Sequence, residues 1–207
     1  MLQSNEIRAE ARRLLSGQWN NCAIIMLVFG ILQAGLSAIP VLGYFSFLIV
    51  TGPLALGLAA IYTNLVRGGS FGIETLFKAK DDFMRSFIAG LLVLLFTLLW
   101  SILLIIPGII ASLSYSMTFF ILNDNPRVSA SDAIKLSQEM MMGHKMELFM
   151  LMLSFIGWFI LGVIGWGIPF LWIGAYYYAS FALFYQSISG ATNEEVTGFI
   201  REESNFN

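Results

Sequence analysis

The residues that could carry acid–base or metal chemistry are few. The chain has one histidine, His144, and one cysteine, Cys22, so neither a histidine cluster nor an intrachain disulfide can form. Asp124, His144 and Glu147 are the candidates for acid–base work on a lipid headgroup at a membrane surface. No phosphate-binding glycine loop, nucleophile elbow or zinc motif occurs. We therefore predict no catalytic residue, no metal and no cofactor, and a lipid-modifying enzyme is the least favoured function.

Charged groups are absent from three long runs, residues 14–66, 86–123 and 148–193. Ionisable residues inside a membrane mark proton relays and voltage sensors, so their absence argues against those classes. The composition, 57% hydrophobic and 12% charged, excludes a disordered chain and a nucleic-acid-binding domain. It also argues against an ordinary soluble enzyme. With a net charge of −2, the chain as a whole does not attract anionic partners.

Each uncharged run is long enough for two membrane helices, because one crossing needs roughly 20 residues. Each run also has a proline near its middle, at Pro40, Pro107 and Pro169. Proline disrupts a helix interior and favours a turn. The sequence thus predicts an all-α, polytopic bundle of six transmembrane helices in three hairpins. The pairs are 22–39 with 45–66, 87–105 with 109–123, and 148–165 with 170–189.

The basic residues predict the orientation of these hairpins. Every lysine and arginine lies at an open end, and the three proline turns carry no charge. By the positive-inside rule the open ends and both termini are cytoplasmic, in a cell membrane. A cleavable signal peptide is the competing interpretation of the N-terminus. Glu6 and Glu10, and an apolar run that continues past residue 40, favour an uncleaved first helix.

A short amphipathic segment precedes each predicted hairpin. In the first, one helical face carries Ile7, Ala11, Leu14 and Leu15. In the third, Ser129 is placed to cap a helix. We predict a single integral membrane domain, residues 1–207, with three similar units at 4–66, 70–123 and 129–189 and a flexible tail at 190–207. Each amphipathic helix would lie at the cytoplasmic surface.

Uncharged polar side chains follow Pro107 and Pro169 and are the candidates for lining a ligand cavity. They are Ser112, Tyr115, Ser116, Tyr176, Tyr177 and Ser180. Small residues at helical spacing also allow close packing of helices, which is the simpler role.

The polar residues of the third cytoplasmic segment are the candidates for binding a protein partner. They are Asp124, Arg127, Lys135, His144 and Lys145. A capped turn after a helix end is the simpler interpretation of Asp124 and Arg127.

Several motifs resemble the bacterial integral-membrane family catalogued as domain of unknown function 975. They are LIIPGIIA at 104–111, YSM at 115–117, DNP at 124–126, AIKLS at 133–137, MGHK at 142–145 and LSFIGW at 153–158. The resemblance covers nearly the whole chain and implies a multi-pass plasma-membrane protein, but no activity. One departure is visible: the family leads us to expect a Pro-Tyr pair in the last helix, where this chain has Ala175 and Tyr176.

The function expected from these observations is non-enzymatic. The protein would accommodate a small or lipidic ligand among its helices, as a transport-like or accessory module. The alternative is a membrane scaffold or regulator that binds a protein partner through its cytoplasmic helices. The lipid bilayer is the expected environment and nucleic acid is not an expected partner. The chain would be a monomer or a lipid-embedded homo-oligomer.

Overall fold

The computed structural model describes residues 4–37, 42–77 and 82–205, and for 36–37, 42–49 and 190–205 it describes the backbone alone. These residues form helices joined by turns and short loops, with no strand among them. The predicted turn at Pro40 lies outside them. The helices are α1 (Ser4–Leu15), α2 (Trp19–Ser37), α3 (Leu42–Val66), α4 (Ile73–Leu76), α5 (Phe83–Leu103), α6 (Ile105–Tyr115), α7 (Thr118–Asp124), α8 (Ala130–Met140), α9 (Lys145–Leu153), α10 (Ile156–Ile164) and α11 (Phe170–Asn205).

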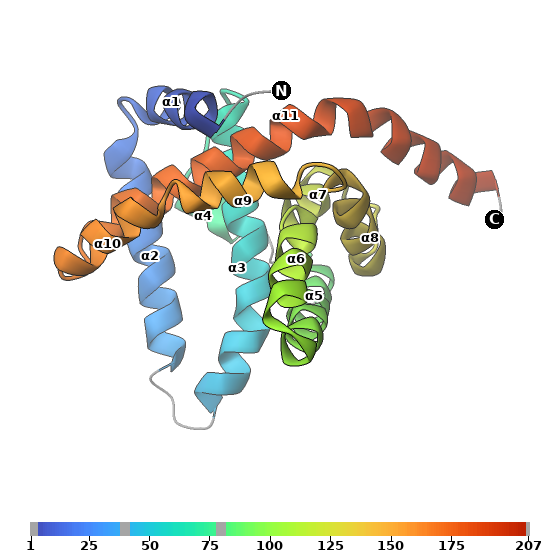
Figure 1. Ribbon diagram of the computed structural model, residues 1–207, viewed down its shortest axis with the longest axis horizontal. Helices are drawn as coiled ribbons and strands as arrows, with labels where there is room; N and C mark the ends of the chain where they lie inside the picture. The colour runs from blue at the N-terminus through green and yellow to red at the C-terminus, as the bar shows by residue number, and fades with distance from the viewer. Residues whose placement is uncertain (1–3, 38–41, 78–81, 206–207) are drawn as a thin grey trace.

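Two helical hairpins extend in the same direction from the charged end of the molecule (Figure 1). One consists of α2 and α3, and the other of α5 with α6 and α7. Their open ends meet, because Arg67 after α3 pairs with Asp124 at the end of α7. Arg85 in α5 donates to the carbonyls of Leu122 and Asn125 at 3.0 and 2.8 Å and so caps α7.

The second hairpin turns at Leu104, whose extended backbone (φ −160°, ψ 146°) separates α5 from α6. Pro107 lies in the first turn of α6, where its missing N–H would have no helical partner anyway. The predicted turn at Pro107 is therefore wrong by three residues. The helices are close together here, since a Cβ on Gly108 would lie 2.8 Å from the Cα of Ser101.

The predicted helix 109–123 is broken between Tyr115 and Thr118 into α6 and α7. The buried hydroxyl of Ser137 holds this break, because it donates to the Ser114 carbonyl at 2.8 Å and accepts from the Met117 N–H at 3.2 Å. A side chain of α8 thus supplies hydrogen bonds that the interrupted helix lacks.

The third hairpin lies across the first two rather than beside them (Figure 1). From residue 176 to residue 185, α11 advances about 14 Å. Over that length it meets the charged ends of three helices in turn: Tyr176 contacts Trp19 of α2, Tyr178 stacks on Tyr62 of α3, and Tyr185 donates to Asp124 of α7. A helix that crossed the bilayer alongside α2, α3 and α7 would instead contact residues progressively farther from their charged ends. The structure therefore does not confirm the six-span arrangement of three parallel hairpins.

The first arm of the third hairpin is also interrupted, between α9 and α10. The guanidinium of Arg8 in α1 donates to the carbonyl of Ser154 at this break, at 3.3 Å. The third hairpin turns at Trp166 and Gly167, whose φ angles are positive, 56° and 85°, and Pro169 directly precedes α11. The contact with Arg8 thus places the break between α9 and α10 beside the amphipathic helix α1.

The amphipathic segments differ in length. In α1, Ile7, Ala11 and Leu15 are buried, as the predicted apolar face requires. The Ser129 hydroxyl accepts from the Asp132 N–H at 3.2 Å and caps α8, as predicted. The second segment contains only the four-residue α4, and residues 78–81 of it are not described. Helix α11 continues to Asn205, past the predicted end of the third unit.

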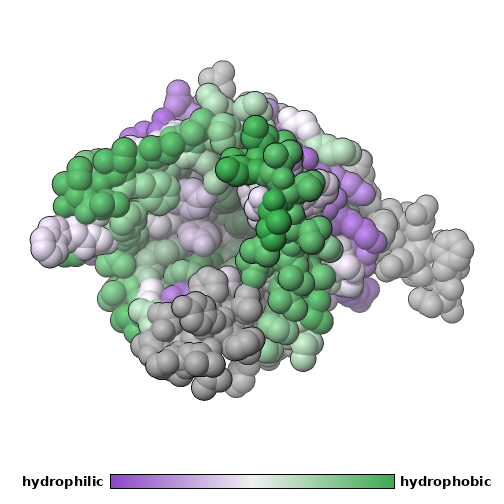
Figure 2. All heavy atoms as spheres, turned by 60° about the horizontal axis from the view of Figure 1, so that its bottom comes forward, coloured by the Kyte–Doolittle hydropathy of each residue, from purple (hydrophilic) through white to green (hydrophobic). Residues whose placement is uncertain are grey.

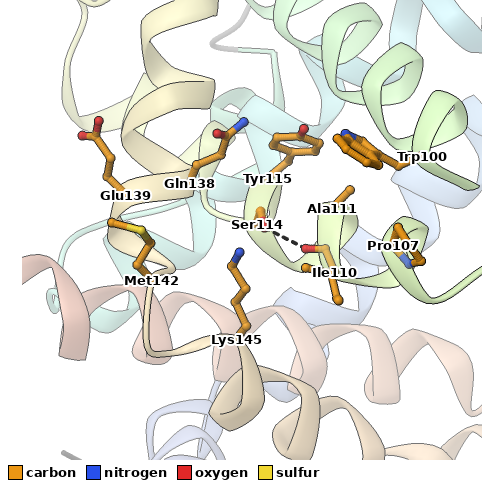
Figure 3. A pocket seen from close by; sticks show the side chains of 10 residues that line it. All are labelled: Trp100, Pro107, Ile110, Ala111, Ser114, Tyr115, Gln138, Glu139, Met142 and Lys145. Carbon is orange, nitrogen blue, oxygen red and sulfur yellow. Dashed lines mark hydrogen bonds between the residues drawn. The ribbon is translucent and has the colours of Figure 1, made fainter.

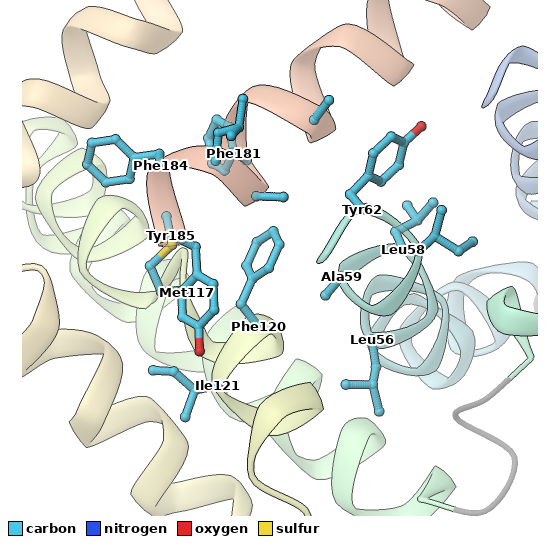
Figure 4. Close-up of a cluster of buried hydrophobic side chains, with 14 of the residues drawn as sticks. Leu56, Leu58, Ala59, Tyr62, Met117, Phe120, Ile121, Phe181, Phe184 and Tyr185 are labelled. Carbon is cyan, nitrogen blue, oxygen red and sulfur yellow. The ribbon is translucent and has the colours of Figure 1, made fainter. Parts of the chain in front are cut away.

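Helices α3 and α5 cross at a contact made by small residues. A Cβ on Gly90 would lie 2.8 Å from the Cα of Gly52, and a Cβ on Gly52 would overlap the backbone of Ser86. Ser86 and Gly90 are four residues apart, the spacing that lets two helix backbones approach. The core continues from this crossing to Tyr62, Phe120 and Tyr185, where α3, α7 and α11 meet (Figure 4).

Three helical segments in the described part of the chain are long and apolar enough to cross a membrane: Phe83–Leu103, Ile105–Asp124 and Lys145–Ile164. Helices α1 and α2, bent by 97°, could form a fourth. Apolar side chains are exposed at the tip of the second hairpin, where Ile102 and Ile105 are 77% and 78% exposed. Figure 2 shows hydrophobic residues along two sides of this face, paler and weakly hydrophilic residues between them, and the most hydrophilic residues mainly at its margin. This surface fits a membrane environment.

Candidate functional site

Two clefts flank α6, one on each side. The first lies between the α5–α6 hairpin and the α8–α9 segment, and has a volume of about 370 Å³. The second lies among α6, α9, α10 and α11, and has a volume of about 360 Å³. Both volumes are at the lower end of the range for small-molecule sites, about 300–1,000 Å³.

The first cleft has walls of opposite character (Figure 3). The wall from α5 and α6 is mainly apolar, with Trp100, Pro107 and Ile110 near the tip of the hairpin, and it also carries Ser114 and Tyr115. The wall from α8 and α9 presents an amide, a carboxylate and an ammonium group: Gln138, Glu139 and Lys145. One cleft therefore offers both an apolar surface and charged, hydrogen-bonding groups.

Lys145 is the group in the first cleft whose placement needs explaining. Figure 3 shows its ammonium group pointing into the space below Ser114, while the carboxylate of Glu139 points away from it. The half-buried Lys145 has no ion pair or hydrogen bond in the described part of the chain. It is also the first residue of α9, where the helix dipole disfavours a cation. No side chain in the described part of the chain neutralises the charge of Lys145.

The second cleft is almost wholly apolar. Phe149, Met152 and Phe159 line it with Tyr177 and Ser112. The Ser112 hydroxyl donates to the Ile109 carbonyl within its own helix, at 2.8 Å. This cleft offers a hydrocarbon surface without a charged group.

The six predicted lining residues are divided between the clefts and the packed interior. Tyr115 lines the first cleft, and Ser112 and Tyr177 line the second. The others satisfy the backbone: Ser116 donates to Leu113, Tyr176 to Arg8 and Ser180 to Tyr176, at 2.7, 3.1 and 2.9 Å. The structure does not bring all six together.

Asp124 forms the strongest polar contact among the predicted cytoplasmic residues. Arg67 donates to both of its carboxylate oxygens, at 2.9 and 2.5 Å, and Tyr185 donates to one of them at 2.9 Å. The hydrogen bond to Asp124 raises the pKa of Arg67 above its usual value. This cluster joins α3, α7 and α11 and leaves Asp124 little capacity to bind a partner.

The other predicted cytoplasmic residues lie apart from that cluster. Lys135 is paired with Asp132 at 3.3 Å, and the Nδ1 atom of His144 lies 3.4 Å from Glu147. Arg127 is exposed. Only Lys145 enters a cleft.

Trp100 and Gln138 are cleft residues that the sequence reasoning missed. Trp100 lies in a hydrophobic helix, and Gln138 lies on an amphipathic one, so neither stands out by type or spacing. Among the described residues, no group of three or more His, Cys, Asp or Glu side chains could hold a metal ion.

A comparison with protein-family models matches residues 101–192 to the family described as "Protein of unknown function (DUF975)". The matched segment runs from the end of α5 into α11 and includes most residues of both clefts. No curated protein and no solved structure matches the chain. Over residues 101–192, therefore, this chain is similar to the family of unknown function 975, which its motifs resemble.

Proposed function

We propose that this chain is a multi-pass membrane protein that holds an amphiphilic, lipid-like ligand in the first cleft without catalysing a reaction on it. The observation that carries the proposal is the opposition of the two walls, Trp100 and Ile110 on one side and Gln138 and Lys145 on the other. A molecule with a hydrocarbon part and a polar head satisfies both walls at once. A wholly polar ligand would leave the apolar wall unused.

The lipid bilayer is the natural source of such a ligand. Ile110 and Trp100 are 46% and 44% exposed, and on the same hairpin Ile102 and Leu103 are more exposed still. The apolar wall therefore continues into the surface that we place in hydrocarbon. A lipid could enter the cleft sideways from the membrane, with no passage through water.

The arrangement of charges supports binding rather than catalysis. General acid–base catalysis needs a proton donor or acceptor held within hydrogen-bond reach of the reacting group, commonly with a second group that orients it. The charged groups of the cleft, Glu139 and Lys145, point in different directions (Figure 3). His144 does not line the cleft, and its Nδ1 atom lies 3.4 Å from a carboxylate oxygen of Glu147.

For the membrane topology we propose that the α2–α3 and α5–α7 hairpins cross the bilayer, with their charged ends and both termini in the cytoplasm. The third hairpin would lie across those ends, near the membrane surface. Its aromatic residues support this placement, since tyrosine and tryptophan favour the interface. Six crossing segments, as the sequence predicts, are the alternative arrangement.

Photo-crosslinking tests the ligand proposal. The purified protein is reconstituted with a phospholipid that carries a photoreactive group on its acyl chain, and the crosslinked peptides are identified by mass spectrometry. We expect crosslinks concentrated on the residues of the first cleft.

A variant in which a bulky side chain fills the first cleft is compared with a matched control variant. Ile110→Trp places a bulky ring in the cleft, whereas Ile102→Trp adds the same ring on an exposed part of the same hairpin. The first variant should lose most of the cleft crosslinks and the second should keep them. Equal labelling of all apolar surfaces, unchanged by Ile110→Trp, would contradict the proposal.

A further inference from the structure

We infer that the headgroup taken by the first cleft is anionic, a phosphate or carboxylate carrying net negative charge, and that Lys145 is the residue that selects it. This inference rests on the proposed function and adds the chemical class of the ligand. The hydrocarbon part of the same molecule would lie along Trp100 and Ile110.

The first support is that the Lys145 charge is unused. The neighbouring lysine, Lys135 on α8, is neutralised by Asp132 at 3.3 Å. Lys145 has no such partner among the described residues, although it is half-buried and faces an apolar wall. An ammonium group without a counter-charge, beside an apolar wall, favours an anionic ligand over a neutral or cationic one.

The second support is the position of Lys145 in its helix. A cation at the first residue of α9 gains nothing from the helix dipole, which at this end favours negative charge. The helix therefore does not account for a cation at this position. Glu147, in the same turn, lies 3.4 Å from the Nδ1 atom of His144 and forms no ion pair with Lys145.

The third support is the type of the other polar groups in the cleft. Trp100, Gln138 and Tyr115 each carry a hydrogen-bond donor, and Figure 3 shows the Gln138 amide facing Tyr115. Donors suit the oxygen atoms of a phosphate or carboxylate. The one acidic lining residue, Glu139, is directed away from Lys145 (Figure 3).

Competition between lipids of equal chain length tests the inference. The protein is purified in detergent, exposed to an equimolar mixture of dioleoyl phosphatidylglycerol and dioleoyl phosphatidylcholine, and the retained lipids are counted by native mass spectrometry. We expect the anionic lipid to be preferred by about tenfold, which corresponds to ~1.4 kcal/mol. Lys145→Gln should reduce that preference to about one, and Lys145→Arg should retain it.

Lys135→Gln is the matched control, because it removes a lysine that is paired on the outer surface of the adjacent helix. It should leave the preference unchanged. Thermal unfolding shows that each variant is folded, and Lys145→Gln should be as stable as the parent protein. An undiminished preference in Lys145→Gln, or an equal loss in Lys135→Gln, overturns the assignment of Lys145.

The same experiment separates the two proposals. If both lipids are retained equally by the unmodified protein, the cleft binds lipid but the anionic preference is wrong. If neither lipid is retained, the proposed function itself fails. Inorganic phosphate at about 10 mM should not displace the bound lipid, since the acyl chain supplies most of the buried surface. Displacement would assign the site to free phosphate instead of a lipid.

Discussion

At the scale of single residues, the same side-chain type has opposite roles in two places of the core. Tyr62 is fully buried and stacks on Tyr178 with ring centroids 5.7 Å apart, yet its hydroxyl has no hydrogen-bond partner in the described part of the chain. The Tyr185 hydroxyl, in contrast, donates to Asp124 at 2.9 Å. A buried hydroxyl without a partner destabilises the fold, whereas one bonded to a carboxylate stabilises it.

Replacing each tyrosine by phenylalanine should therefore change stability in opposite directions. Tyr62→Phe removes an unsatisfied group and should raise the free energy of unfolding by about 1 kcal/mol. Tyr185→Phe removes a charge-assisted hydrogen bond and should lower it by about 1–2 kcal/mol. Denaturant unfolding in detergent micelles measures both. Destabilisation of similar size in the two variants would show that ring packing, and not the hydroxyl group, decides the effect.

At the scale of the elements, the break between α6 and α7 depends on one hydroxyl group of another helix. Ser137→Ala leaves the Met117 N–H without its partner at a fully buried position. We expect a loss of about 1–3 kcal/mol in the free energy of unfolding. Ser112→Ala, in the same region but exposed and bonded within its own helix, should change it by less than about 0.5 kcal/mol. Equal effects would mean that the break does not need the α8 contact.

The crossing of α3 and α5 depends on residues without side chains. Gly52→Ala places a methyl group against the Ser86 backbone, which cannot rotate away as a side chain could. The helices must separate, at a cost of about 1–3 kcal/mol. Gly30→Ala is the control, because nothing lies within 4 Å of a Cβ at that exposed position of α2. It should be neutral or slightly stabilising in thermal unfolding, since alanine is the better helix former. A tolerated Gly52→Ala would contradict the close crossing.

The elements also show how far the sequence could be interpreted. The helical class, the apolar face of α1 and the Ser129 cap follow from periodicity and local chemistry, and the structure confirms them. The turn at Leu104 was missed because proline is also acceptable in the first turn of a helix. The Ser137 contact joins segments 20 residues apart, so no local pattern could indicate it.

At the scale of the whole molecule, charge distribution predicted which segment ends lie together but not how the hairpins are arranged. Arg67 and Asp124 do meet, as the common location of the charged ends requires. The uncharged run 148–193, which contains the first part of α11, is long enough for two membrane helices, but length does not distinguish a crossing helix from one that lies across others. Its tyrosines contact partners at the ends of α2, α3 and α7, and those tertiary contacts decide its position. The clefts follow from the same arrangement, which explains why Lys145 was predicted as a partner-binding residue and not as a cleft residue.

Cysteine labelling in intact cells distinguishes this arrangement from six parallel spans. In a Cys22→Ala background, Leu104→Cys and Ile168→Cys each place a thiol at an exposed hairpin tip. If the third hairpin lies across the charged ends of the others, a membrane-impermeant maleimide added outside should modify position 104 but not position 168. Arg127→Cys, at the charged end, should react only after the membrane is opened. Modification of both tips from outside would establish the six-span arrangement, because only a hairpin that crosses the bilayer brings residue 168 to the outer surface.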